Sequence, residues 1–337
     1  MPKLVIASAS YGLFAPEAMR LLSEVFDEIR RVDLKANEPE ESTIGKVGDA
    51  DALILGAGGL ITRRVMLEAA NLKIIARHGI GLDNVDLAAA TELGIPVTYC
   101  RHTGEEVSVA EHAVALMLAC ARRVVEADKA VREGRWGARV HLVGLELRGK
   151  TLGVIGLGAI GREVAQIMKG GFGMRVLAYD PYVPNEVFDR VGATRVDLET
   201  LLRESDVITV HVPLTDETRG LLNAEKLAIV KQGAILVNTS RGAVIDEAAL
   251  RKALEEGRIY YAGLDVFERE PPIGSPLLAL QNVVLTPHVA AFTREALYRM
   301  DMANAEDLVR FFRGEKPLRL ANPEVYERGL RFGRKPP

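Results

Sequence analysis

A glycine-rich turn between an apolar strand and a helix constrains this chain more than any other feature. Gly156, Gly158 and Gly161 follow a predicted strand at residues 152–155 and open a predicted helix at residues 162–168. In this setting the first glycine makes a tight turn, the second lets a pyrophosphate approach the backbone, and the third lets the helix pack closely on the strand. The N-terminus of the helix adds free N–H groups and positive partial charge. The pattern predicts a dinucleotide-binding βαβ unit.

An acidic residue follows where such a unit requires one. Asp180 ends the next predicted strand and lies 19 residues after Gly161, where a carboxylate can hold a ribose diol. A carboxylate there repels a 2′-phosphate, and residues 181–184 contain no Arg or Lys to neutralise one. The sequence therefore predicts NAD as the cofactor. The alternative is an ordinary turn that Asp180 merely caps.

Short apolar segments alternate with helical patterns along most of the chain. Strands are expected at residues 3–7, 52–55, 73–76, 96–99, 151–155, 175–179, 207–211, 234–238, 259–264 and 283–285. In the first hundred residues, helices are expected at 16–29, 62–70 and 85–93. This alternation predicts an α/β protein with parallel sheets covered by helices on both faces. A chain of 337 residues suffices for about two such domains.

One long helix is expected from residue 105 to residue 131, and its apolar surface is wider than one amphipathic stripe. It is either buried inside the monomer or packed in part against a second subunit. A last helix is expected at residues 294–312, followed by a polar tail.

Composition excludes several classes of protein. The longest apolar run, residues 113–121, is less than half of the ~20 residues that cross a bilayer. The net charge of −3 offers no basic field for nucleic acid or an anionic membrane, so neither partner is expected. Two cysteines, Cys100 and Cys120, make neither a disulfide framework nor a metal cluster. We therefore expect no metal and a cytoplasmic location.

Charged residues follow several of the predicted strands. Arg241 follows the strand at 234–238, at the carboxyl end where open α/β sheets bind ligands. A guanidinium there suits a substrate carboxylate, the alternative being a surface salt bridge. Glu270 and His288 follow the next two strands and could pair, with the carboxylate orienting the ring and favouring its protonated form. A lone histidine after a proline is more often structural, and only the company of Arg241 and Glu270 favours catalysis. The histidines without such company are His78, His102, His112 and His141.

A second glycine-rich segment, Gly56-Ala57-Gly58-Gly59, also follows a strand but lacks the dinucleotide spacing. Its backbone N–H groups could bind a carboxylate, or the segment could simply turn the chain.

Together these segments resemble the D-isomer-specific 2-hydroxyacid dehydrogenase family, in particular its phosphoglycerate dehydrogenase and glyoxylate reductase branch. The resemblance extends over roughly residues 53–322 and rests on the segments 77–86, 108–112, 156–161, 211–215, 238–246, 265–271 and 286–288. It implies two doubly wound domains. A Rossmann NAD-binding domain, residues 103–288, is inserted into a flavodoxin-like substrate domain, residues 1–102 and 289–337.

The resemblance also implies roles for individual residues. His288 is expected to act as acid and base, Glu270 as its partner and Arg241 as the clamp on the substrate carboxylate. Asp265 is expected to meet the nicotinamide carboxamide. The residues expected to bind the cofactor are Ile80, Gly156, Gly158, Ala159, Ile160, Gly161, Asp180, His211, Val212, Pro213, Thr218, Thr239, Ser240, Arg241, Asp265 and His288. Those expected to bind the substrate are Gly56, Ala57, Arg77, Gly79, Arg241 and His288.

The implied activity is hydride transfer between NAD and C2 of a D-2-hydroxy acid, in a homodimer. The alternative is an NAD(H)-sensing binding protein of the corepressor type, which resembles the same family. The sequence departs from the family pattern at Glu105, where Asn is usual, and at Gly56, where phosphoglycerate-specific relatives often have Arg. We therefore expect glyoxylate or hydroxypyruvate to be turned over at least as well as phosphohydroxypyruvate. The regulatory domain of the longer phosphoglycerate dehydrogenases is not expected.

Overall fold

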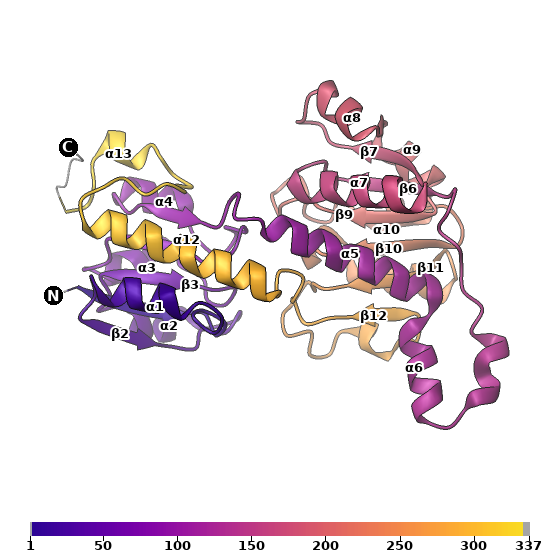
Figure 1. Cartoon of the computed structure of the whole chain (residues 1–337), viewed down its shortest axis with the longest axis horizontal. Helices are drawn as coiled ribbons and strands as arrows, with labels where there is room; N and C mark the ends of the chain where they lie inside the picture. The colour runs from indigo at the N-terminus through magenta and orange to yellow at the C-terminus, as the bar shows by residue number, and fades with distance from the viewer. Residues whose placement is uncertain (1, 333–337) are drawn as a thin grey trace. The chain divides into compact units, whose positions relative to one another are not determined.

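The computed structural model describes residues 2–332, which divide into two compact units (Figure 1). The first unit consists of the residues up to Glu105 together with those from Phe292 onward, and the second unit is Glu106–Ala291. Each unit is built on one parallel sheet, so the expected fold class of two doubly wound α/β domains is confirmed.

The first unit holds a five-stranded sheet in the order β2-β1-β3-β4-β5. Its strands are β1 (Lys3–Ala7), β2 (Glu28–Arg31), β3 (Ala52–Leu55), β4 (Ile74–Arg77) and β5 (Val97–Tyr99). Its helices are α1 (Pro16–Ser23), α2 (Glu40–Val47), α3 (Arg63–Glu68), α4 (Leu87–Glu92), α12 (Arg294–Phe312) and α13 (Val325–Arg328). Helices α1 and α12 cover one face of the sheet, and α2, α3 and α4 cover the other. Strands β3 and β4 are buried on both faces, which explains the apolar runs at residues 52–55 and 74–76.

The expected helix at residues 16–29 is wrong in its second half. Helix α1 ends at Ser23, and Glu28–Arg31 instead forms strand β2, which pairs in parallel with β1. This strand lies at the edge of the sheet. Its two end residues are exposed, its two middle residues are half-buried, and three of the four are charged, so it has no alternating pattern by which the sequence could have revealed it.

The expected polar tail is also wrong in part, because its first residues complete the sheet. Tyr99 N–H donates to Arg319 O and Ala321 N–H to Val97 O, which covers the free edge of β5. Asn322 is fully buried, and its carboxamide bonds the Val97 N–H and the Ile95 carbonyl. Covering an edge strand removes a row of unpaired backbone groups from solvent.

The second unit holds a seven-stranded parallel sheet in the order β12-β11-β10-β9-β6-β7-β8. Its strands are β6 (Thr151–Ile155), β7 (Arg175–Tyr179), β8 (Thr194–Arg195), β9 (Val207–Val210), β10 (Ala234–Asn238), β11 (Ile259–Leu264) and β12 (Val283–Leu285). Its helices are α5 (Glu105–Arg122), α6 (Val124–Arg132), η1 (Trp136–His141), α7 (Ala159–Phe172), α8 (Asn185–Val191), α9 (Leu198–Glu204), α10 (Ala224–Ala228), η2 (Gly242–Val244), α11 (Glu247–Glu255) and η3 (Pro276–Ala279). Helices α5, α7 and α8 pack on one face, and α9, α10 and α11 on the other. The strand order reverses between β6 and β9, and open α/β sheets bind ligands at such a switch point.

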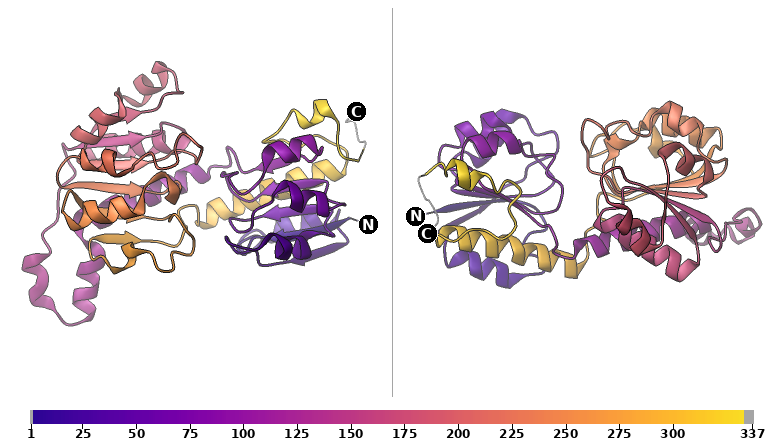
Figure 2. Two further views of the ribbon diagram at one scale, coloured as in Figure 1. Left: turned by 180° about the vertical axis from the view of Figure 1, so that it is seen from behind. Right: turned by 90° about the horizontal axis from the view of Figure 1, so that it is seen from above.

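The single long helix expected at residues 105–131 is wrong, because the chain breaks it at Arg123. Arg123 has a left-handed backbone (φ 52°), and its side chain bonds Glu126 and the Tyr261 hydroxyl. Beyond the break, α6 and η1 form an arm that projects from the second unit (Figure 2). The arm region exposes large apolar side chains: Val124, Val125, Val131, Trp136, Val140 and Val143. Among residues 2–332, no helix is both long and apolar enough to cross a membrane.

Candidate active site

The glycine turn between β6 and α7 has the shape that a pyrophosphate needs. Gly156 has φ +90°, and a Cβ there would press against the backbone of His211. A Cβ on Gly161 would collide with the carbonyl oxygen of Gly156. At Gly158, by contrast, no atom of the described chain lies within 4 Å of an added Cβ. Gly156 and Gly161 therefore permit tight packing, and Gly158 leaves open space at the N-terminus of α7.

Asp180 is fixed beside this turn. Its Oδ2 accepts the Leu157 N–H at 2.8 Å, and its Oδ1 accepts the N–H groups of Tyr182 (2.9 Å) and Val183 (3.2 Å). The carboxylate is half-buried, and its two oxygens together offer about four acceptor positions. It is therefore held in place and can still accept a further hydrogen bond from a ribose hydroxyl.

Polar atoms without partners lie at the ends of the two neighbouring strands. The His211 ring follows β9 and is buried, which lowers its pKa to about 3, so the ring is neutral at pH 7. His211 Nε2 lies 2.8 Å from Thr209 Oγ1, but within residues 2–332 its buried Nδ1 has no hydrogen-bond partner. The same holds for Thr239 Oγ1 after β10. Buried polar atoms normally have partners, so these two fit a site for the hydroxyl and phosphate groups of a dinucleotide.

The remaining expected cofactor residues of this unit follow the same strand ends. Pro213 and Thr218 belong to one turn, in which Thr218 Oγ1 donates to the Pro213 carbonyl at 2.6 Å. Ser240 N–H and Oγ–H both donate to Asn238 Oδ1, at 2.9 and 2.7 Å. The structure thus places these expected NAD residues along the carboxyl edge of β6, β7, β9 and β10, whereas Asp265 and His288 follow β11 and β12.

His288 and Glu270 form a close pair. Glu270 Oε2 lies 2.7 Å from His288 Nδ1, and the side chains are 35% and 30% exposed. Glu270 Oε1 accepts the Phe267 N–H at 3.2 Å, which orients the carboxylate. Because the pairing uses Nδ1, Nε2 is the nitrogen that can exchange a proton with a ligand.

Asp265 anchors the backbone around His288. His288 has a left-handed conformation (φ 54°), which is strained for a residue with a side chain. Asp265 is fully buried, and its carboxylate accepts the N–H groups of Val289 (2.9 Å) and Ala290 (2.8 Å) and the hydroxyl of Thr286 (2.6 Å). Burial alone would raise the pKa of Asp265, but these hydrogen bonds and one from His112 outweigh it and leave the pKa below its usual value. Sequence reasoning did not find this anchoring role.

His112 is a second residue that sequence reasoning missed. It comes from α5, and its Nε2 lies 3.0 Å from Thr286 Oγ1 and 3.5 Å from Asp265 Oδ1. The sequence did not indicate these partners of His112. His112 is one of the few polar residues on the inner side of a very apolar helix. This feature of the sequence could have indicated that His112 has a polar partner.

Arg241 lies between β10 and η2, next to the segment that carries Glu270. Its Nη1 donates to the Ser240 carbonyl at 2.8 Å, and its own carbonyl accepts from Asn238 Nδ2 at 2.9 Å. A Cβ on Gly242 would collide with the backbone of Phe267, so only glycine lets these two loops touch. Arg241, Glu270 and His288 thus follow three adjacent strands, β10, β11 and β12.

The other expected site residues lie in the first unit, at the carboxyl ends of β3 and β4: Gly56, Ala57, Arg77, Gly79 and Ile80. Arg77 is buried and donates to Asn84 Oδ1 (3.2 Å) and to the Leu55 and His78 carbonyls. Asn84 in turn donates to the carbonyls of Gly56 and Gly59, so Arg77 and Asn84 together hold the glycine-rich loop.

A further histidine–carboxylate pair lies beneath this loop. His78 Nε2 is 2.9 Å from Asp301 Oδ1, and His78 Nδ1 is 2.9 Å from Ser8 Oγ. The His78 and Asp301 side chains are 3% and 0% exposed. The sequence did not indicate these partners of His78. The partners come from residues 8 and 301, far from position 78 in the sequence.

Comparison with known proteins identifies the class. Residues 114–290, more than half of the chain, match the family model for the NAD-binding domain of D-isomer-specific 2-hydroxyacid dehydrogenases. The chain belongs to this family.

Individual relatives extend the match beyond that domain. The D-3-phosphoglycerate dehydrogenase of Archaeoglobus fulgidus is 47% identical over 296 residues, which are 86% of this chain and 56% of that protein. This chain thus spans little more than half the length of that relative. The glyoxylate reductase of Aeropyrum pernix is 46% identical over 92% of this chain and 94% of its own length. Among solved structures, D-lactate dehydrogenase of Aquifex aeolicus with NAD and lactic acid superposes with a TM-score of 0.81 at 30% identity, covering 93% of this chain and 96% of that one.

Proposed function

We propose that this chain is an NAD-dependent oxidoreductase that interconverts a D-2-hydroxy acid and its 2-oxo acid. The observation that carries the proposal is the partly exposed His288–Glu270 pair, held in the same unit as the glycine turn and Asp180. We further propose that residues 103–288 bind NAD and that the discontinuous part, residues 1–102 and 289–337, binds the substrate through Gly56, Ala57, Arg77 and Gly79, with Ile80 contacting the cofactor.

The residues of this chain would divide the work as follows. NAD, when bound, accepts or supplies the hydride at C2 of the acid. Arg241 binds the substrate carboxylate and orients C2, which is positioning together with electrostatic stabilisation. His288 Nε2 takes the hydroxyl proton during oxidation and returns it during reduction. Glu270 stabilises the imidazolium that results. Asp265, through the Val289 and Ala290 N–H groups, keeps the His288 backbone in its left-handed conformation.

NADH consumption with glyoxylate, hydroxypyruvate, pyruvate and phosphohydroxypyruvate tests the proposal. Turnover of at least one acid is expected, and Arg241→Ala should abolish it while leaving NADH affinity nearly intact. Tight NADH binding without turnover of any of the four acids would favour the corepressor-type sensor instead. Equal loss of turnover and NADH affinity in Arg241→Ala would make Arg241 a cofactor residue.

We propose that the substrate is a small, unphosphorylated acid. At Gly56 an added Cβ would lie 3.1 Å from the Ser8 Cα, so this loop cannot carry the arginine found in phosphoglycerate-specific relatives without shifting. The expected result is a kcat/KM for glyoxylate or hydroxypyruvate at least equal to that for phosphohydroxypyruvate at the same ionic strength. A hundredfold preference for the phosphorylated acid would contradict it.

We propose NAD rather than NADP, because the Asp180 carboxylate repels a 2′-phosphate. The kcat/KM with NADH should exceed that with NADPH. In Asp180→Ser the ratio of kcat/KM with NADH to kcat/KM with NADPH should be smaller. Equal or better use of NADPH by the parent enzyme would show that Asp180 does not select the cofactor.

We propose a homodimer in which the arm formed by α6 and η1 is covered by a second copy. Val124, Val125 and Trp136 are more than half exposed on this arm, and contiguous exposed apolar surface usually marks an interface. Equilibrium sedimentation should give a dimer, and Trp136→Glu should weaken it. A stable monomer at micromolar concentration would contradict the proposal.

We place the protein in the cytoplasm, because both cysteines are buried free thiols and the chain has no disulfide among its described residues. Cell fractionation tests this placement.

A further inference from the structure

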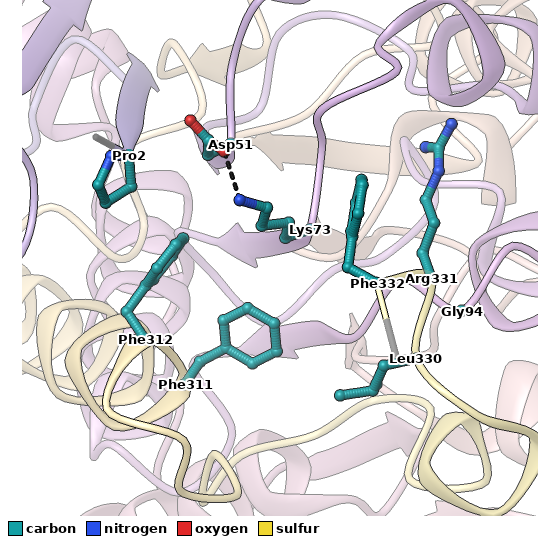
Figure 3. A pocket seen from close by; sticks show the side chains of 9 residues that line it. All are labelled: Pro2, Asp51, Lys73, Gly94, Phe311, Phe312, Leu330, Arg331 and Phe332. Carbon is teal, nitrogen blue, oxygen red and sulfur yellow. Dashed lines mark hydrogen bonds and ion pairs between the residues drawn. The ribbon is translucent and has the colours of Figure 1, made fainter. Parts of the chain in front are cut away.

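A concave site lies in the first unit, at the amino edge of its sheet (Figure 3). Asp51 directly precedes β3 and Lys73 directly precedes β4, whereas Gly56 and His78 follow the same strands at the opposite edge. The cavity has a volume of about 420 Å³, within the range of roughly 300–1,000 Å³ that is usual for small-molecule sites.

Three phenylalanine rings form its walls. Phe311 and Phe312 come from the last turn of α12, and Phe332 comes from the C-terminal segment. In Figure 3 the rings of Phe312 and Phe332 stand on opposite sides of the cavity, with Phe311 and Lys73 between them. Phe312 is held edge-to-face by Phe26 (4.7 Å between centroids) and by Phe311 (5.3 Å). Because these contacts fix the ring, the cavity is prepared for a flat apolar group.

The segment that carries Phe332 is itself anchored. Arg331 N–H donates to the Gly94 carbonyl at 3.0 Å, and a Cβ on Gly94 would collide with this segment. Arg331 Nη1 donates to the carbonyls of Met66 (2.8 Å), in α3, and of Ala69 (3.3 Å), directly after α3. The third aromatic wall therefore rests on three hydrogen bonds between parts of the chain that are far apart in sequence.

The charges around the cavity leave a surplus of one positive charge. Lys73 pairs with Asp51 at 2.7 Å, and the Lys73 side chain remains 33% exposed. Arg331 adds a second cation, and burial lowers its pKa from the usual value without removing its charge. Both cations lie within 6 Å of the Phe332 ring centre, Lys73 at 5.4 Å and Arg331 at 5.9 Å. One negative charge on a ligand complements this surplus, whereas a dianion would exceed it.

We propose that this Phe312 pocket is a binding site for a flat aromatic monocarboxylate. The ring system lies between Phe312 and Phe332, and the carboxylate points to Lys73. The ligand needs no 2-hydroxy or 2-oxo group, because neither the His288–Glu270 pair nor the Gly156–Gly161 turn is among the residues that line the cavity. The site is therefore separate from the dehydrogenase chemistry proposed above and does not depend on it.

Calorimetric titration of the full chain with 2-naphthoate tests the proposal. The titration is made with NADH and oxalate present, so that these occupy the proposed active site. Lys73→Gln and Phe332→Ala should each raise the dissociation constant at least tenfold. Two matched variants of the same unit should change it less than twofold. Lys46→Gln breaks a comparable pair (Lys46–Glu38, 2.6 Å, Lys46 35% exposed), and Phe14→Ala removes a comparably exposed ring (43%, against 47% for Phe332).

The charge requirement has its own test. The uncharged 2-naphthamide has the same ring system and should bind at least tenfold more weakly than 2-naphthoate. Equal binding of the amide would overturn the role of Lys73.

Three results would overturn the site itself: no binding of 2-naphthoate, unchanged binding in both pocket variants, or binding that oxalate and NADH abolish. Thermal melting of each variant shows whether it is folded. A crystal soaked with 2-naphthoate gives an independent reading, since density between Phe312 and Phe332 supports the proposal and density only elsewhere contradicts it.

Discussion

Each unit holds a histidine–carboxylate pair at the carboxyl edge of its sheet, and the two pairs differ mainly in burial. His288 and Glu270 are 2.7 Å apart and about one-third exposed, whereas His78 and Asp301 are 2.9 Å apart and 3% and 0% exposed. Both ring nitrogens of His78 have neighbours, because Nδ1 lies next to Ser8 Oγ. A histidine can exchange a proton with a ligand only through an accessible nitrogen. The His288–Glu270 pair therefore suits catalysis, and the His78–Asp301 pair suits a structural role.

The buried pair joins three segments of the first unit. Asp301, on α12, accepts the Gly12 N–H at 2.8 Å through Oδ2, and its backbone carbonyl accepts the Tyr11 hydroxyl at 3.0 Å. His78 extends from the end of β4, and Tyr11 packs edge-to-face on its ring. A buried charge is costly unless it is paired, so removing one partner should lower the free energy of unfolding.

The largest expected effect is on catalysis by the exposed pair. His288→Ala should lower kcat by ~10²–10⁴, the usual contribution of a positioned general acid or base. Stability should change little, because the ring is only half-buried. Steady-state kinetics with the best acid of the panel measures the first effect and thermal melting the second. His141→Ala, which removes an exposed histidine, is the control, and a loss of less than tenfold in His288→Ala would contradict the assignment.

The second effect is on the stability of the first unit. His78→Ala leaves the Asp301 carboxylate buried without its partner and should destabilise this unit by about 3–5 kcal/mol. Hydrogen exchange under increasing urea, read separately for peptides of the two units, measures the loss. The kcat per folded molecule should fall less than tenfold. A destabilisation under ~1 kcal/mol, or an effect spread equally over both units, would remove the distinction between the pairs.

A pair of matched amide variants sharpens the comparison. Glu270→Gln removes the carboxylate that lies 2.7 Å from His288 Nδ1, so kcat should fall, though by less than in His288→Ala, and stability should change little. Asp301→Asn should leave kcat per folded molecule nearly unchanged and instead cost about 1–3 kcal/mol of stability, because the buried side chain that accepts the Gly12 N–H is altered. Steady-state kcat and urea unfolding are measured for both variants. A loss of kcat in Asp301→Asn with a loss of stability in Glu270→Gln would contradict the two assignments.

The smallest expected effect concerns Ser8. Ser8→Ala removes one hydrogen-bonding partner of His78 and should cost about 1 kcal/mol, the usual net value of a single hydrogen bond. The measurement is the same urea experiment. A loss as large as that in His78→Ala would show that Ser8, and not Asp301, is the principal partner.

The parts of the molecule that could be predicted from sequence depend on neighbours along the chain. The glycine turn, the strand before it and Asp180 after it are set by backbone conformation and short-range hydrophobic pattern, and the structure forms them at the expected positions. Strand β2 was missed because an exposed edge strand needs no apolar pattern. The break at Arg123 was missed because no Gly or Pro marks it, and one hydrogen-bond partner of the Arg123 side chain, Tyr261, lies 138 residues away.

By itself, the sequence determined the alternation of strands and helices, the parallel sheets that follow from it, and the residue types at the strand ends. Local propensity and burial pattern act over a few residues, so one chain is enough to read them. Only the tertiary structure decided that His288 is accessible and that His78 is buried. His78 meets Asp301 across 223 positions, and His112 meets Asp265 across 153. Pairing and burial at such separations arise only when α12 and α5 pack against their sheets, and no local pattern encodes them.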